Sequence, residues 1–223
     1  MQSTADWAQL NFGCCELGDK RRTNRLVRVA EQAGHNPSGS LPNQMEHVDD
    51  LKAAYRLFDS ANVTFEAVAR PHWELTKQSA KGRCLVLGDT TEISFRKNRQ
   101  IEGLGPTGNG SGQGFLLHNA LLVSAESQEL IGVAGQTIHY RKKKQRSKKK
   151  RESASQMMKR ERESEVWGKV IDQIGKPQND EVEYIHVFDR GADNFEDYCR
   201  LLQNNGEWVI RASLMNRYVL DGQ

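Results

Sequence analysis

The sequence contains no long apolar run and only four cysteines among its 223 residues. None of its apolar stretches reaches the roughly 18 to 20 residues that a membrane-spanning helix needs, and its polar start lacks the order of a signal peptide. We therefore expect a cytoplasmic protein without membrane partners. Cys14 and Cys15 are adjacent, Cys84 and Cys199 stand far apart, and no Cys-x-x-Cys pair occurs. Reduced thiols are the expected state, and the scattered histidines argue against structural zinc.

A large excess of either charge is also missing, because 32 Lys and Arg residues nearly balance 29 Asp and Glu residues. The positive charge is nevertheless concentrated, since nine of the eleven residues from Arg141 to Arg151 are basic. Like charges repel, so this run is expected to be a solvated segment that is stabilised by a polyanion. The alternative is a solubilising linker. The candidate polyanion-binding residues are Lys142, Lys143, Lys144, Arg146, Lys148, Lys149 and Lys150.

Residues 1–80 are expected to form a helical domain, because apolar residues recur there at helical spacing. The clearest helix follows Asp19, a predicted N-cap, and would bury Leu26 and Val29. Its basic residues fall on another face, where they suit phosphate contact, although such a row can also be no more than a hydrated surface. Further helices are expected at 51–58 and 64–78, with Pro71 kinking or dividing the second. The candidate phosphate-binding residues here are Lys20, Arg21, Arg22, Arg25 and Arg28.

Residues 81–223 are richer in strand-like runs, which predicts an α+β or α/β fold with a mixed sheet and flanking helices. Three consecutive antiparallel strands are expected, then helix, strand, helix and strand. Residues 103–108 match the letters GxGxxG, but they lead into more glycines and a strand, so we interpret them as a hairpin loop. The expected strands are 84–88, 115–123, 130–139, 182–188 and 208–212, and the expected helices surround Trp167 to Ile174 and span 194–203.

Two aspartates, Asp89 and Asp189, each follow an apolar strand-like run. A right-handed crossover would make these two strands parallel, and if they are neighbours the carboxylates meet at the same edge of the sheet. Carboxylates held that close repel each other and call for a cation, and Mg²⁺ prefers carboxylate oxygens. Either aspartate alone could instead cap a turn or a helix.

Several motifs resemble those of the DDE transposases of the insertion-sequence-four (Tn-five-like) family, and the resemblance covers nearly the whole chain. The motifs are Ala5 to Ala8 (ADWA), Leu17 to Val27 (LGDKRRTNRLV), Ala54 to Phe58 (AYRLF), Gly88 to Thr91 (GDTT), Asp189 to Asp193 (DRGAD) and Trp208 to Ala212 (WVIRA). The resemblance implies a helical domain that binds transposon ends, followed by an RNase-H-like catalytic core. In that core Asp, Asp and Glu side chains hold two Mg²⁺ or Mn²⁺ ions.

By this resemblance Asp89 and Asp189 are catalytic metal ligands, and Arg21, Arg22, Arg25 and Arg56 contact double-stranded DNA at transposon ends. It also implies a homodimer for the full-length protein and a location in the prokaryotic cytoplasm, associated with the nucleoid.

The third carboxylate of the family pattern is missing. It belongs to a Tyr-x2-Arg-x3-Glu-x6-Lys signature, and none of the five tyrosines is followed three places later by Arg. The chain therefore resembles a transposase with a truncated core, and three interpretations stay open. It is a transposase fragment that cannot cleave or join DNA alone, a non-catalytic protein that occupies transposon ends, or a pseudogene-like remnant that folds poorly.

Overall fold

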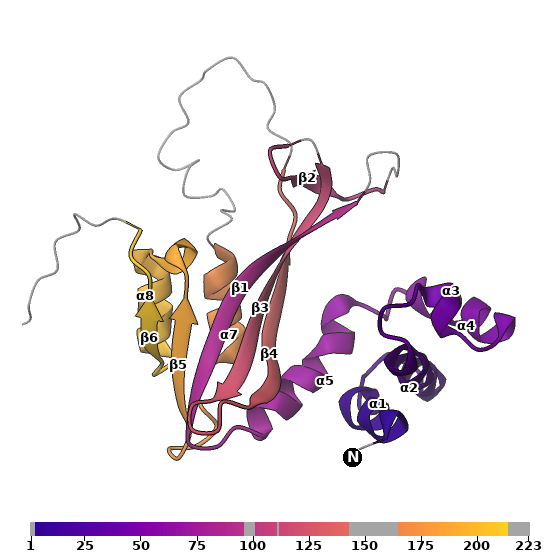
Figure 1. Ribbon diagram of the computed structural model, residues 1–223, viewed down its shortest axis with the longest axis horizontal. Coiled ribbons are helices and arrows are strands. Elements are labelled where there is room, and N and C mark those ends of the chain that lie inside the picture. The colour runs from indigo at the N-terminus through magenta and orange to yellow at the C-terminus, as the bar shows by residue number, and fades with distance from the viewer. Residues whose placement is uncertain (1–2, 96–100, 111, 143–164, 214–223) are drawn as a thin grey trace, which may run out of the picture. The chain divides into compact units, whose positions relative to one another are not determined.

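The computed structural model describes residues 3–95, 101–110, 112–142 and 165–213 (Figure 1). The chain divides into two compact units, residues 1–78 and 79–223. Within the described residues, no helix combines the length and apolar character needed to cross a membrane.

The first unit is helical. Its second helix begins after Asp19, as predicted, and the Asp19 side chain accepts a hydrogen bond from the backbone N–H of Arg21. Pro71 lies inside the last helix, which is continuous, so the proline does not divide it. A short helix that was not predicted begins at Leu41. The helices are α1 (Thr4–Phe12), α2 (Lys20–His35), α3 (Leu41–Gln44), α4 (Val48–Phe58) and α5 (Phe65–Gln78).

Helix α2 is central to the packing of this unit. Leu26 on α2 belongs to one buried cluster with Leu17 and Leu57, and Val29 belongs to a second cluster with Ala54. Because Leu57 and Ala54 both lie on α4, the apolar stripe of α2 fixes α4 beside it. Burying a Leu or Val side chain contributes roughly 1.5 to 3 kcal/mol, so these contacts hold the two helices in one arrangement.

The second unit is built on a six-stranded sheet within the described residues. The strand order is β2-β3-β1-β5-β6, and β4 pairs with the other edge of β3. The three consecutive antiparallel strands predicted from sequence are β1, β3 and β4, and the short strand β2 was expected as a loop. The elements are β1 (Arg83–Phe95), β2 (Gly105–Thr107), β3 (Gly112–Ser124), β4 (Leu130–His139), α7 (Glu165–Ile174), β5 (Glu183–Phe188), η1 (Arg190–Ala192), α8 (Phe195–Gln203) and β6 (Glu207–Ile210).

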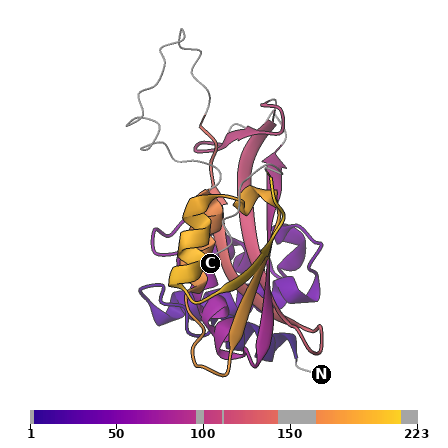
Figure 2. The same cartoon turned by 90° about the vertical axis from the view of Figure 1, so that its left-hand side faces the viewer.

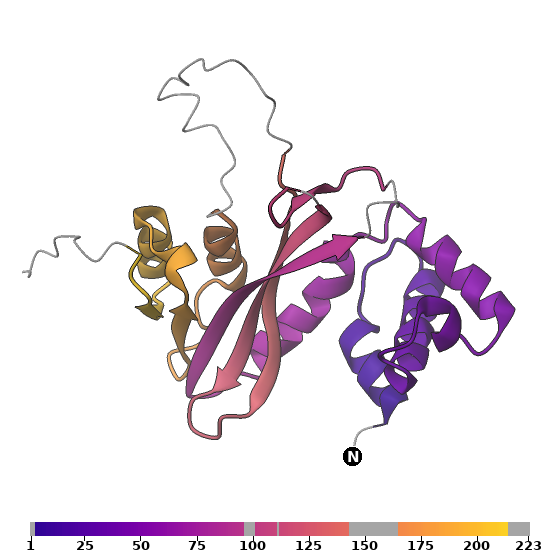
Figure 3. The same ribbon diagram turned by 45° about the horizontal axis from the view of Figure 1, so that its top comes forward.

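Helices α7 and α8 lie side by side against one face of this sheet (Figures 2 and 3). Alternate strand residues such as Val86, Leu122 and Tyr184 point into the same buried cluster as Trp167 and Ile171 of α7. The helical spacing predicted for Trp167 to Ile174 is confirmed, since its apolar residues are buried. Helices followed by a mixed, partly antiparallel sheet give the chain an α+β architecture.

Candidate active site and nucleic-acid interface

The parallel pairing of β1 with β5 brings the two candidate catalytic aspartates to corresponding positions. The register runs from Arg83 opposite Glu183 to Leu87 opposite Val187. Asp89 and Asp189 each lie two residues beyond the last pair of this ladder, so the same register, if continued, would align them. Both side chains are exposed. The expected meeting of the two strands is therefore present, and both carboxylates are open to solvent.

Asp189 begins a tight turn as the N-cap of η1. Its Oδ1 accepts a hydrogen bond of 2.7 Å from the backbone N–H of Gly191. The turn is closed by Asp193, whose Oδ1 accepts from the Tyr198 hydroxyl at 2.8 Å. Its Oδ2 accepts from the backbone N–H of Ser213 at 2.6 Å. Asp193 thus links the turn to α8 and to the chain after β6, which limits where Asp189 can move.

Trp167 of α7 packs against the two chain segments that carry Asp89 and Asp189. A Cβ atom on Gly88 would lie 2.5 Å from the Phe188 ring and 3.0 Å from Trp167, and one on Gly191 would lie 2.9 Å from Trp167 Nε1. Such distances are too short for a side chain, so glycine is needed at both positions. The backbone next to each aspartate therefore packs directly against the indole ring of Trp167.

His118 of β3 lies beside this pair and is fully buried. Its Nδ1 is 2.8 Å from the Thr90 hydroxyl, and its ring centroid is 4.0 Å from that of Trp167. Burial lowers the pKa of His118 to about 4, whereas the charges of Asp89 and Asp189 act in the opposite direction. Both carboxylates are therefore within electrostatic reach of one imidazole.

The donor chemistry of the pair suits a hard divalent cation, since both groups offer carboxylate oxygens. One Asp189 oxygen already accepts a backbone hydrogen bond, which leaves the other to face a ligand. Within the described part of the chain, no cluster of three or more His, Cys, Asp or Glu residues is arranged to hold a metal. The two aspartates therefore offer carboxylate groups of the kind that Mg²⁺ prefers.

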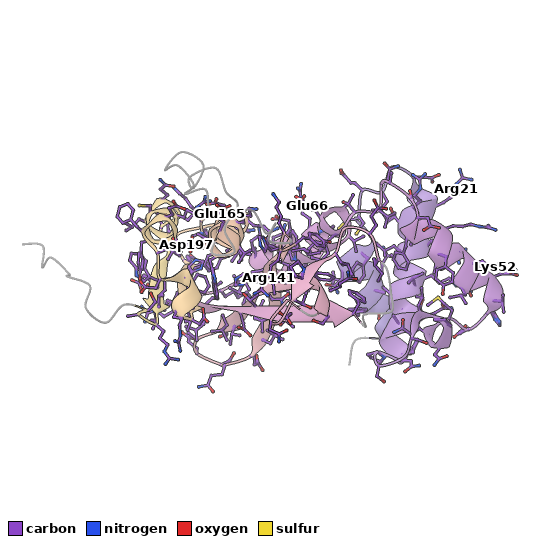
Figure 4. The ribbon with its side chains drawn as sticks, turned by 90° about the horizontal axis from the view of Figure 1, so that it is seen from above. Arg21, Lys52, Glu66, Arg141, Glu165 and Asp197 are labelled. Atoms are coloured by element: carbon purple, nitrogen blue, oxygen red, sulfur yellow. The ribbon has the colours of Figure 1, made fainter. Side chains whose placement is uncertain are left out.

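The basic residues of α2 differ in their solvent exposure and in their hydrogen-bond and ion-pair partners. The Arg21 side chain is 92% exposed (Figure 4), and it makes a surface ion pair with Asp19. Arg22 donates to the backbone carbonyl of Leu17 at 2.9 Å, and Lys20 is exposed at the start of the helix. Arg21 and Lys20 therefore face solvent, as the sequence predicts, while Arg22 also fixes the preceding loop.

Arg25 and Arg28 were expected to present free guanidinium groups, but both are paired with Asp50 of α4. Arg25 reaches Oδ1 at 2.8 Å and Arg28 reaches Oδ2 at 2.9 Å. Gln32 is also oriented toward Oδ2, at 3.4 Å. Asp50 is 7% exposed, so this charge cluster joins α2 to α4. A guanidinium has five N–H donors, which leaves each arginine with donors for another acceptor.

Arg56 of α4 and Lys142 are both exposed, as a role in phosphate contact requires. Arg56 makes no ion pair with a described residue. The other predicted residues of the basic run lie outside the described residues: Lys143, Lys144, Arg146, Lys148, Lys149 and Lys150. Arg141, at the start of the run, pairs with Glu92 of β1 at 3.2 Å.

Sequence reasoning missed His118, Thr90 and Asp50. A signal for His118 exists, because it replaces an apolar residue at a buried position in the alternating strand 115–123. No comparable signal marks Asp50, since its two partners lie 22 and 25 residues away. Only the packing of α2 on α4 creates that cluster.

Comparison with protein families bears on the first unit. Residues 4–63 match the family described as transposase DNA-binding. This range contains α1 to α4, and therefore both the exposed basic residues of α2 and the Asp50 cluster. The match identifies this part of the chain as similar to the DNA-binding region at the N-terminus of transposases.

Proposed function

We propose that the chain is a transposase polypeptide whose first unit binds the ends of a transposon and whose second unit is an RNase-H-like catalytic core. The observation that carries the DNA-binding part is the match of residues 4–63 to the transposase DNA-binding family. The exposed Lys20, Arg21 and Arg56 support it, because cationic side chains neutralise phosphates.

The proposal for the second unit rests on the parallel pairing of β1 and β5. That pairing supports Asp89 and Asp189 as ligands of a catalytic Mg²⁺ or Mn²⁺ ion. When bound, such an ion would stabilise charge on the phosphoryl oxygens of DNA. The chain's own contribution is to hold the two carboxylates in place through Trp167 and the η1 turn.

Purified protein and a fluorescent duplex would test the DNA-binding proposal by anisotropy over a range of salt concentrations. We expect log affinity to fall linearly with log salt, by about 0.9 for each phosphate contacted. The variant Arg56→Ala should bind more weakly and show a smaller slope. Lys169→Ala is the matched control, because Lys169 is exposed on α7 in the second unit. An equal loss of DNA affinity in both variants would show that the duplex is bound only by nonspecific electrostatic attraction.

Metal binding by the second unit is tested separately, by electron paramagnetic resonance of Mn²⁺ titrated with protein. Asp89→Asn and Asp189→Asn should each weaken binding, whereas Asp180→Asn, in an exposed loop, should not. Identical Mn²⁺ binding by all four proteins would contradict the assignment of the two ligands.

The alternative function is a DNA-binding protein that occupies transposon ends without cutting them. These 223 residues by themselves do not contain the Tyr-x2-Arg-x3-Glu-x6-Lys signature that carries the third carboxylate. Loss of a group from a two-metal site reduces phosphoryl transfer by orders of magnitude. We therefore expect this polypeptide to bind duplex DNA with Mg²⁺ and leave it uncut. Metal-dependent cleavage that Asp89→Asn abolishes would instead establish a complete enzyme.

A further inference from the structure

We propose that Asn24 is the side chain through which α2 reads a base in the major groove of DNA, with Arg21 and Arg28 binding phosphates on either side of it. The inference rests on the DNA-binding function proposed above. It adds the residue that would select one sequence over another.

The two faces of α2 differ in chemistry. Thr23, Leu26 and Val29 are buried. The opposite face carries Arg21, Asn24 and Arg28, all exposed and separated by three, four and seven residues. Residues at these separations lie on one side of a helix. The positive charge of this face lies in the first half of α2, because the next residue on the same side, Glu31, is acidic.

Arg21 and Arg28 are placed to flank the central residue. At 1.5 Å per residue each arginine lies about 5 to 6 Å from Asn24 along the helix axis. The longer arginine side chains can therefore reach phosphates on the two sides of the base that the shorter Asn24 side chain faces. Charge complementarity makes double-stranded DNA the expected occupant of this face.

The arginines are also held in different ways that suit this role. The ion pair of Arg21 with Asp19 is at the surface and can be exchanged for a phosphate. Arg28 keeps one N–H group on Asp50, and its side chain is still 51% exposed. Asp50 thereby orients the Arg28 guanidinium and leaves further donors for DNA.

Asn24 has the chemistry needed to read a base. Its amide makes no hydrogen bond to a described residue, so its donor and acceptor both face solvent. Asn can pair with N6 and N7 of adenine through these two groups at once. Contacts from Arg21 and Arg28 to phosphates would position the helix without selecting sequence.

The test is selection of bound duplexes from a library with a randomised segment, using the purified 223-residue chain. We expect the wild type to favour an A·T pair at one position. Asn24→Ala should lower that preference by about 5- to 150-fold, the range for a bidentate base contact. Its preferences elsewhere and its affinity for unselected duplex should stay the same. Asn43→Ala is the matched control, because Asn43 is exposed on α3.

Arg28→Ala separates base reading from phosphate contact. It should weaken binding to all duplexes alike and reduce the slope of log affinity against log salt by about 1. Retention of the A·T preference by Asn24→Ala would overturn the inference. Equal binding of the wild type to every duplex would also overturn it, while leaving DNA binding intact. A wild type that binds no duplex at low salt would overturn the inference and the proposed function together.

Discussion

Substitution of His186 should make the second unit less sensitive to acid. His186 lies on β5, is 1% exposed, and has both ring nitrogens without a hydrogen-bond partner among the described residues. Burial lowers its pKa from 6.5 to about 4. The folded protein therefore keeps the imidazole neutral at pH values where the unfolded chain protonates it, and stability is lost as the pH falls from 6.5 toward 4.

The size of this loss follows from the pKa difference. Each pH unit between the two pKa values costs about 1.4 kcal/mol, so the loss from His186 at pH 5 is about 2 kcal/mol. His118, whose pKa is also about 4, acts in the same direction. Asp197 acts in the opposite direction, because burial raises its pKa to about 6 and the folded protein gains stability as that carboxyl is protonated. A wild-type pH profile alone would therefore mix these three groups.

The variant His186→Leu isolates the contribution of His186 to this pH dependence. Urea unfolding, followed by tryptophan fluorescence, gives the free energy of unfolding of both proteins at pH 7.5 and pH 5. We expect the difference between variant and wild type to shift by about 2 kcal/mol in favour of the variant at the lower pH. His139→Leu is the matched control, because His139 lies in the same unit and is only partly buried. If His186→Leu shows the same pH dependence as the wild type, the imidazole is not kept neutral by burial.

Two other substitutions test the packing beside each candidate site. Gly88→Ala should lower the free energy of unfolding by about 1 to 3 kcal/mol, because the new Cβ would collide with Phe188; urea unfolding measures the loss. Combining it with Phe188→Leu should recover part of that loss, and no recovery would contradict the steric explanation. Asp50→Ala should lower the urea midpoint of the first unit, because it removes the carboxylate shared by Arg25 and Arg28. Burial raises the pKa of Asp50, but its hydrogen bonds and the two arginines hold it below 3.8 overall. The stabilisation by Asp50 should therefore persist above pH 4 and disappear at lower pH. If Asp50→Ala leaves the urea midpoint unchanged, the charge cluster does not hold α2 and α4 together.

The sequence predicted most elements of the second unit, because their signals are local. Strand β4 has the predicted bounds of 130–139, and α7 buries the residues that recur at helical spacing. The right-handed crossover rule also predicted that β5 would run parallel to β1. These features depend on alternation, helical period and chain connectivity, all of which can be read along the chain.

The sequence was less informative where long-range pairing decides the outcome. The first strand was expected at 84–88, but β1 continues to Phe95 because β3 pairs with it over its whole length. The three residues of β2 form a strand for the same reason, although they lie in a glycine-rich segment. A polar stretch becomes a strand when a partner strand satisfies its backbone groups.

The sequence by itself determined which residues could carry the chemistry: two aspartates after apolar runs and a helix with a basic face. The tertiary structure decided how those residues are held. It placed Trp167 and His118 beside the aspartates, and it paired two of the arginines on α2 with Asp50. Side-chain contacts of this kind join residues that are far apart in the chain, so they arise only when packing brings their elements together.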